Sequence, residues 1–377
     1  MSDTRPDVVV IGGGIVGASA SAFLAEAGAS VVLVEQEKIG AAASGRNSGV
    51  VQHPFDPVLT ALYLDSVELY RRLADESADF ELPSKPAGLL LVSADVDGVR
   101  RLTADLTATV PHVQPSFVDG PALRALEPAL APDVAACRLA IGYPVAPGAA
   151  VRAYADLAAG RGARLALGDP AELLIDGDRV RGVRVGADII EAATLVVTGG
   201  PWTPSILDPG GRWQPIVRSW GVIAELALPA APRHVLEEAE IDAAIEPPPQ
   251  GGEVDLSEVA FSLVTAADRS ALGSTFLAER PDPEGIVPAL IERGSRFVPG
   301  LASVPIVGSR VCARPVSRDG RPLVGHVPWL RDAFVAAGHG PWGISTGPAT
   351  GRLIADLVLG RQPAIPAALD PGRFVAP

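Results

Sequence analysis

Three glycines and one acidic residue near the amino terminus have the types and the spacing that bind a dinucleotide. Gly12, Gly14 and Gly17 form the pattern G-x-G-x-x-G, and Glu35 follows Gly17 by 18 residues. The first glycine permits a tight turn, the second lets a pyrophosphate approach the backbone, and the third lets a helix pack against a sheet. The acid accepts hydrogen bonds from a ribose diol and repels a 2′-phosphate. These residues indicate an adenine dinucleotide and leave NAD and FAD as alternatives.

The surrounding elements are those that such a site needs. Residues 8–11 are an unbroken apolar run, as expected for a strand buried on both faces of a parallel sheet. A helix is predicted from about Ile15 to Ala27, and the unpaired amides at its start would face the phosphates. Gly28 ends that helix, and residues 31–34 form the second strand. A glycine turn without a ligand is therefore disfavoured.

Composition fits an enzyme of two or three domains. The chain has 377 residues, of which 48% are hydrophobic, and a net charge of −13 that argues against a nucleic-acid partner. No apolar run reaches the roughly 18 residues that span a bilayer. The first six residues show no signal-peptide pattern, so a cytoplasmic location is expected. Cys137 and Cys312 are too few for a disulfide framework or a metal site, so no metal is expected.

The residues after Glu35 favour FAD. An NAD dehydrogenase usually continues into further strand and helix units, whereas here a long loop of small residues follows. Residues 44–49, SGRNSG, offer amides, hydroxyls and one guanidinium suited to a pyrophosphate and a flavin ring. In isolation a solvated loop is the simpler interpretation. Two distant segments change it: 193–202 and 334–348 each predict a buried strand and a glycine-rich turn, the second leading into a helix predicted from Ala349 to Leu359.

Together these segments resemble the FAD-dependent D-amino-acid oxidase (DAO) family, in particular its glycine oxidase, sarcosine oxidase and D-amino-acid dehydrogenase branches. The resemblance covers almost the whole chain and rests on ordered motifs as well as on their wording. These are GGGIVG with Glu35, ASGRNSG, YPVAPGAAVRAYADLAAGRGARL, LVVTGGPW, ARPVSRDGRPLVG at 313–325 and AAGHGPWGISTGPATGRLIADLVLG at 336–360.

The resemblance implies an α/β fold with a Rossmann-like FAD/NAD(P)-binding domain, the glutathione-reductase-like FAD fold, and an inserted, mainly antiparallel β-sheet substrate domain. We expect the FAD-binding domain to comprise residues 1–83, 142–210 and 305–377, and the substrate domain residues 84–141 and 211–304. Sequence patterns predict strands in the latter at 88–93, 216–228, 259–263 and within 270–276. The loop 243–258, with three prolines in a row, is expected to be mobile, either as a lid or as an insertion.

The resemblance also implies which residues hold FAD. They are Gly12, Gly14, Ile15, Val16, Gly17, Glu35, Gln36, Ser44, Gly45, Arg46, Asn47, Ser48, Ala171, Gly199, Gly200, Trp202, Arg314, Gly338, Gly340, Trp342, Gly343, Ile344, Ser345 and Thr346. Amides near the predicted helix at 349 would stabilise negative charge on the flavin ring. His339 either lies beside that ring or bonds to backbone in its turn. Trp202 and Trp342 either form pocket walls or pack beneath the roof domain.

Cys312 raises the question of a covalent flavin. It falls where sarcosine oxidases of this family carry the cysteine that bonds to the flavin ring. Attack by the thiolate would require a pKa lowered by Arg310 or Arg314. A small, inert core residue is the alternative, and non-covalent FAD is the expected state.

Arg314 is the expected catalytic residue for an amino-acid substrate. Flavin oxidation of an amine mainly requires that the reacting carbon is oriented over the ring. A planar, permanently charged group holds the substrate carboxylate through two parallel hydrogen bonds. Arg314, in the pattern RP-x-x-x-DG-x-P-x-x-G, occupies the family position for this role. The alternative is an arginine that pairs with Asp319 or caps nearby backbone.

Arg46 and His53 are the other catalytic candidates. Arg46 would touch a phosphate, the flavin edge or the substrate. The SGRNSG wording also resembles 2-hydroxyglutarate and glycerol-phosphate dehydrogenases, in which a histidine follows the motif. Here Gln52 holds that place and His53 comes one residue later. This weakens a hydroxy-acid reading, since oxidation of an alcohol needs a base; His53 is either that base or a wall residue.

The function expected is therefore that of a flavoprotein oxidoreductase that oxidises the C–N bond of a D-amino acid, glycine, N-methyl glycine or a related carboxylated amine to an imine, which water hydrolyses. The alternatives are an FAD-dependent 2-hydroxy-acid dehydrogenase and a flavin subunit of a multi-chain dehydrogenase. The expected partners are the substrate, O2 or another electron acceptor, and further copies of the chain.

Overall fold

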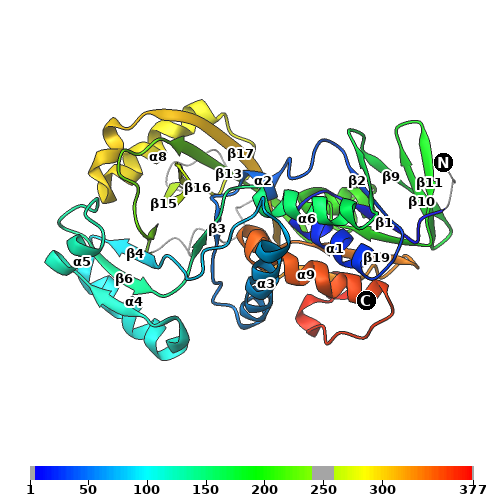
Figure 1. Cartoon of the computed structure of the whole chain (residues 1–377), viewed down its shortest axis with the longest axis horizontal. Helices are drawn as coiled ribbons and strands as arrows, with labels where there is room; N and C mark the ends of the chain where they lie inside the picture. Colours follow the sequence, from blue (N-terminus) through cyan, green and yellow to red (C-terminus); the bar gives the residue numbers. More distant parts are fainter. Residues whose placement is uncertain (1–4, 240–258, 376–377) are drawn as a thin grey trace.

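The computed structural model of the chain describes residues 5–239 and 259–375. The predicted mobile loop 243–258 lies outside the described residues. Figure 1 shows two halves side by side, with the short helix α2 (Ala43–Arg46) between them. Within the described ranges no helix combines the length and apolar character that crossing a membrane requires.

A six-stranded sheet forms the half at the right of Figure 1. Its order is β18-β19-β12-β1-β2-β8, and all neighbours are parallel except β18 and β19. The strands are β1 (Val8–Ile11), β2 (Val31–Glu35), β8 (Arg164–Leu167), β12 (Thr194–Val197), β18 (Leu323–His326) and β19 (Ala333–Ala337). The two strands predicted around the glycine motif are confirmed, and the second extends by one residue to Glu35.

Both faces of this sheet are covered, which explains the unbroken apolar runs. Val8 and Val10 pack in one core with helices α1 (Ile15–Glu26), α3 (Pro57–Glu76), α6 (Ala149–Gly160) and α9 (Gly343–Val358). Val9 and Ile11 pack in another core on the opposite face. That core includes the antiparallel strands β9 (Ala171–Asp176), β10 (Arg179–Val185) and β11 (Asp188–Glu191), and the helix α7 (Thr203–Leu207). The predicted α/β, Rossmann-like fold is confirmed.

Helix α9 begins six residues before its predicted start. The sequence analysis placed the start at Ala349, after Pro348, but Pro348 lies inside the helix. Proline has no N–H, so the carbonyl four residues earlier, that of Ile344, loses its helical donor. The hydroxyl of Tyr70 on α3 donates to that oxygen at 2.6 Å instead. A contact from another helix thus permits a proline where sequence rules predict a boundary.

An eight-stranded sheet forms the other half, with the order β17-β13-β16-β15-β14-β4-β6-β5. Only β14 and β4 are parallel neighbours, so the mainly antiparallel prediction is confirmed. The strands are β4 (Leu89–Ser93), β5 (Ser116–Val118), β6 (Ala135–Leu139), β13 (Ile216–Leu226), β14 (Val235–Glu238), β15 (Val259–Ala266), β16 (Arg269–Thr275) and β17 (Ile306–Ser317). The helices α4 (Val96–Thr109), α5 (Gly120–Leu126) and α8 (Pro283–Phe297) cover it.

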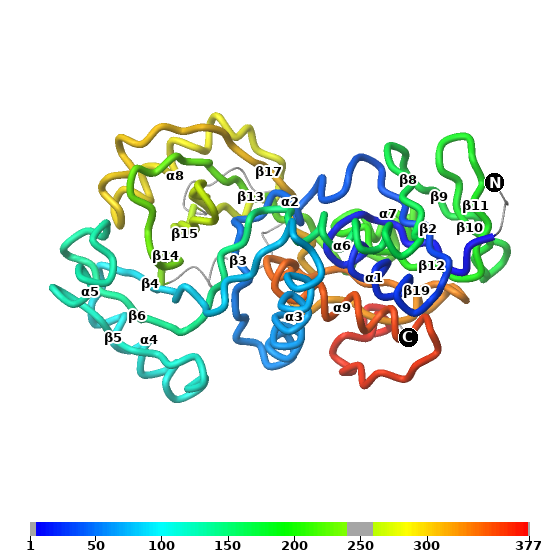
Figure 2. The backbone as a smooth tube through the Cα atoms, viewed as in Figure 1, coloured from blue at the N-terminus to red at the C-terminus, as the bar shows by residue number. Residues whose placement is uncertain are grey.

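Strand β17 belongs to this second sheet. The family resemblance predicts that residues 305–377 belong to the FAD-binding domain, but β17 pairs with β13 along nearly its whole length. The chain then crosses to the first sheet at β18, a path that Figure 2 shows as one continuous tube. A two-stranded pair, β3 (Val50–Val51) and β7 (Tyr143–Pro144), lies between the halves. The division into two domains stays a prediction.

Candidate active site

A cavity of about 370 Å³ lies between the two sheets, within the range of roughly 300–1,000 Å³ typical of ligand pockets. Its wall combines the carboxyl ends of β1 and β2 with residues of five strands of the second sheet, β13 to β17. Most of the predicted cofactor residues lie on this wall. They are Gly12, Gly14, Ile15, Val16, Glu35, Gln36, Ser44, Arg46, Asn47, Ser48, Ala171, Gly199, Gly200, Trp202, Arg314, Gly340, Trp342, Gly343, Ile344 and Ser345.

Four predicted cofactor residues do not lie on the wall: Gly17, Gly45, Gly338 and Thr346. A β-carbon at Gly17 would overlap the carbonyl oxygen of Gly12, and one at Gly45 would overlap that of Gly40. Gly17 therefore lets α1 pack closely, which is the part the motif assigns to its third glycine. Thr346 is buried and donates to the Trp342 carbonyl at 2.8 Å. Gly17, Gly45 and Thr346 therefore contribute to the packing of the chain behind the residues that line the cavity.

Glu35 is held in a fixed orientation at the end of β2. One carboxylate oxygen accepts from the Gly13 amide at 2.7 Å and the other from the Glu37 amide at 3.0 Å. The amide of Ile15, expected to face a phosphate, donates to the Ser44 hydroxyl at 3.0 Å. Gly12 has φ +111°, which only glycine adopts readily. This glycine turn with a fixed acid fits the ADP half of a dinucleotide.

The segment 44–49 is not a solvated loop. Its first residues belong to α2, and Arg46 donates to the Val311 carbonyl of β17 at 3.2 Å. Arg310 of β17 in turn donates to the Asn47 carbonyl at 3.0 Å. Arg310 also forms an ion pair with Glu225. The segment is thus fastened to the second sheet while Arg46 and Asn47 line the cavity.

Arg314 projects from β17 into the cavity wall and is half-buried. Its guanidinium donates to the Thr275 carbonyl at 2.7 Å and to the Ser274 hydroxyl at 2.8 Å, and lies 4.5 Å from the ring centre of Phe276. Burial lowers the pKa of Arg314. A β-carbon at Gly221 would lie 2.6 Å from both terminal nitrogens, so the glycine makes room for the guanidinium. Among the described residues it forms no ion pair.

Of the two alternatives weighed for Arg314, pairing with Asp319 is wrong, because Asp319 pairs with Arg373 at 2.7 Å. Capping of backbone is confirmed by the bond to Thr275. It coexists with exposure of the guanidinium to the cavity. A half-buried cation without a carboxylate partner in the described chain is suited to an anionic ligand.

His53 lies away from the cavity. It is buried among Phe55, Tyr63 and His112, with its Nε2 3.1 Å from that of His112. Burial, with a smaller contribution from His112, lowers the pKa of His53 to about 4. The preceding residue, Gln52, lines the cavity instead. The structure thus contradicts the placement of His53 as a base within the site.

Cys312 and His339 line the cavity in neutral form. Burial raises the pKa of the Cys312 thiol and outweighs the opposing effect of Arg314, Arg46 and Arg310. Burial lowers the pKa of His339 to about 4. Its Nε2 lies 3.0 Å from the Thr350 hydroxyl, so the predicted alternative, a bond to turn backbone, is replaced by a side-chain partner.

Sequence reasoning missed the wall that the second sheet supplies. From the second sheet come Gly221, Ile223, Glu237, Ser262 and Ser274, with Phe276 directly after β16; Gln52, directly after β3, was missed as well. Glu237 lies on β14, a strand of four residues of which two are acidic. Its sequence contains no run of residues that favour β-structure, so the strand was not predicted. Ser262 and Ser274 lie on predicted strands. The sequence of a single strand, however, does not show which of its two faces will line a cavity.

A dinucleotide-binding sheet, a second sheet roofing it and a half-buried cation at their shared cavity define a flavin-dependent oxidoreductase. The chain belongs to the family of FAD dependent oxidoreductases (DAO), whose model matches residues 7–357. The glycine turn, the fixed Glu35 and the Arg46 to Ser48 wall fit the cofactor FAD.

Individual relatives extend this likeness over nearly the whole chain. A glycine oxidase of Pseudomonas aeruginosa is 29% identical, over 97% of this chain and 99% of the relative. The crystal structure of glycine oxidase from Geobacillus kaustophilus matches with a TM-score of 0.83 at 23% identity, covering 99% and 100% of the two chains. Iminodiacetate oxidase from Chelativorans sp. BNC1 matches with a TM-score of 0.79 at 25% identity, covering 97% and 98%.

Proposed function

We propose that this protein oxidises the C–N bond of an amino acid or another carboxylated amine, giving an imine that water hydrolyses. The observation that carries the proposal is Arg314, a half-buried cation on the cavity wall whose hydrogen-bond partners in the described chain are neutral. A carboxylate is the ligand that such a guanidinium binds best. The similarity to a glycine oxidase and to an iminodiacetate oxidase supports the same substrate class.

The residues of the chain position the reactants and exclude water. Arg314 anchors the carboxylate, which fixes the neighbouring carbon relative to the cofactor. Glu35 binds the ribose, and the first amides of α9, from Gly343 to Ser345, stabilise negative charge at the end of the cavity that they line. FAD, when bound, supplies the acceptor for the hydride that leaves the substrate carbon.

A 2-hydroxy-acid substrate is the weaker candidate. Oxidation of an alcohol needs a base for the hydroxyl proton. His53 lies outside the cavity, and the pKa values of His53 and His339 are about 4. The choice of O2 or another acceptor, a cytoplasmic location, an oligomeric state and a dependence on a partner chain remain predictions.

Arg314→Met tests the proposal. We expect kcat/KM for the best amino-acid substrate to fall by about 100-fold or more, because a buried charge pair is lost. FAD content should stay that of the wild type. Arg318→Met is the matched control, since Arg318 is exposed and donates to the Gln214 carbonyl. An FAD-loaded Arg314→Met protein with wild-type turnover would contradict the proposal.

The products separate the candidate reactions. Purified protein is offered amino acids, N-methyl amino acids and hydroxy acids, with air or an artificial dye as the acceptor. Release of ammonia or a primary amine supports the proposed reaction. A keto acid formed without amine release supports the hydroxy-acid alternative.

A further inference from the structure

Glu237 places a carboxylate on the same cavity wall as Arg314. It lies on β14 of the second sheet, is half-buried and lines the cavity. Its in-register neighbour on β15 is Ser262, which also lines the cavity. One wall therefore carries a positive group and a negative group.

Gln52 holds the Glu237 carboxylate in place beside the cavity. The Gln52 side-chain nitrogen donates to Glu237 Oε2 at 3.2 Å, and its backbone amide donates to the Ser345 hydroxyl in the first turn of α9 at 2.8 Å. The other side-chain atom, Gln52 Oε1, is buried and has no hydrogen-bond partner in the described part of the chain. Gln52 thus orients the Glu237 carboxylate through its side-chain nitrogen, while its own Oε1 has no surface open to the cavity.

The two charged groups are separated by a short stretch of sheet. The Arg314 guanidinium reaches across Gly221 to Ser274 and Thr275 of β16. Strand β14, which carries Glu237, lies two strands further along the sheet, about 10 Å away. A zwitterion whose carboxylate meets Arg314 can direct its cationic nitrogen along the wall to Glu237.

We propose that Glu237, positioned by Gln52, binds the positively charged nitrogen of the substrate and so selects amines over alcohols. This deepens the proposed function and rests on it, since Arg314 must hold the carboxylate of the same molecule. A hydroxy acid offers no positive charge to Glu237, and its carboxylate is repelled by that residue. Selection is then made by two opposite charges on one sheet, and the bound ammonium releases one proton to solvent before the hydride leaves the carbon.

Two unreactive probes test the role of Glu237 separately from turnover. 2-Aminoisobutyrate and 2-hydroxyisobutyrate have the same carbon frame and no hydrogen on the reacting carbon, so neither can lose a hydride. Their dissociation constants are measured from the flavin absorbance change of the FAD-loaded protein. We expect the wild type to bind the amine about tenfold or more tightly than the alcohol, as for a charged hydrogen bond.

Glu237→Gln keeps the shape and removes the charge. In this variant the tenfold preference should fall to near one, while binding of the alcohol stays equal or becomes tighter. Arg314→Met should weaken both probes. Glu238→Gln is the matched control: Glu238 is the next residue, but it binds Arg293 and the Phe261 amide and does not line the cavity. Its variant should keep the wild-type preference.

The outcomes separate this inference from the proposed function. An unchanged preference in Glu237→Gln, with both probes sensitive to Arg314→Met, overturns the role of Glu237 and leaves the carboxylate site standing. Equal binding of the two probes by the wild type also overturns it. Binding of neither probe by the wild type overturns both proposals.

Discussion

Arg314 shows how a single half-buried charge is kept in place by neutral groups. The Thr275 carbonyl, the Ser274 hydroxyl and the Phe276 ring occupy part of the guanidinium without neutralising it. Such an arrangement costs stability unless a ligand completes it. Arg314, whose charge is unfavourable to remove from water, is therefore the residue that we assign to the substrate carboxylate.

Cys312 is expected not to form a bond to the flavin. Burial raises the pKa of its thiol, so the reactive thiolate is scarce despite three arginines nearby. After acid precipitation of the FAD-loaded protein, the yellow colour should appear in the supernatant. Cys312→Ala should retain FAD to the wild-type level. Colour that remains with the wild-type pellet, but not with that of the variant, would contradict this prediction.

At the scale of elements, helix α9 depends on a contact from α3. Pro348 cannot donate to the Ile344 carbonyl, and the Tyr70 hydroxyl donates to it instead. Tyr70→Phe removes this hydrogen bond. We expect the free energy of unfolding to fall by about 1–3 kcal/mol, the cost of an unsatisfied buried acceptor. Denaturant titration of the FAD-loaded and FAD-free proteins measures it.

Tyr63→Phe is the control for Tyr70→Phe. Tyr63 lies on the same helix and is buried, but its hydroxyl forms no hydrogen bond within the described ranges. Equal stability losses in the two variants would show that the Tyr70 hydroxyl has no special part in α9.

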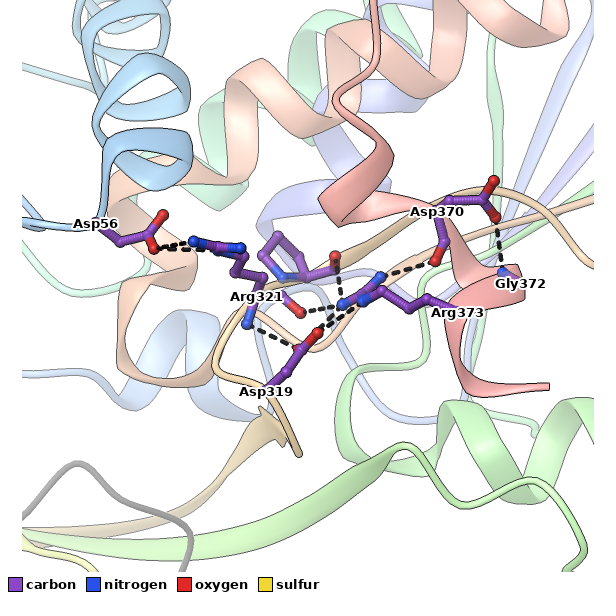
Figure 3. Close-up of polar contacts among 7 residues, drawn as sticks. Asp56, Asp319, Arg321, Asp370, Gly372 and Arg373 are labelled. Carbon is purple, nitrogen blue, oxygen red and sulfur yellow. Dashed lines mark hydrogen bonds and ion pairs between the residues drawn. The ribbon is translucent and has the colours of Figure 1, made fainter. Parts of the chain in front are cut away.

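At the scale of the whole molecule, the shortest connection between the two sheets runs from β17 to β18. Residues 318–322 lead from β17 in the second sheet to β18 in the first. Figure 3 shows how this connection is fastened on both sides. Arg321 pairs with Asp56 at 2.8 Å, the residue that caps α3, and Asp319 pairs with Arg373 of the carboxyl-terminal turn at 2.7 Å.

Asp319→Asn tests the pH dependence of this connection. Burial alone would raise the pKa of Asp319, but hydrogen bonds from Arg373 and from the Arg321 amide outweigh it and lower the pKa. The ionised form therefore stabilises the fold at neutral pH, and this contribution is lost as the pH falls through the lowered folded-state value. We expect the variant to be less stable by about 1 kcal/mol at pH 7, because the pair is partly exposed.

Urea titrations at several pH values check this prediction. The difference between wild type and Asp319→Asn should shrink below about pH 4 and vanish in stronger acid. Asp105→Asn on α4, whose carboxylate forms no ion pair in the described part of the chain, should match the wild type throughout. A difference that does not change with pH would rule out the ionised pair as its source.

The half of the molecule built on the six-stranded sheet was predictable from the sequence. The half built on the eight-stranded sheet was only partly predictable. The glycine motif, its helix and both strands depend on local rules of spacing and conformation, and they appear where expected. Glu237 and Gln52 meet through the pairing of distant segments, which no local pattern encodes. His53 was misplaced for a related reason: one residue decides which face of a chain segment meets the cavity.

Gly221 on β13 leaves the space that the side chain of Arg314 on the neighbouring strand β17 occupies. Because a β-carbon there would collide with the guanidinium of Arg314, the residue at 221 limits where that guanidinium can lie. A larger residue at 221 would push the anchor outward and shorten the space left for the remainder of a ligand. The size of the residue at position 221 therefore provides a way to change the length of ligand that fits, while Arg314 itself is retained.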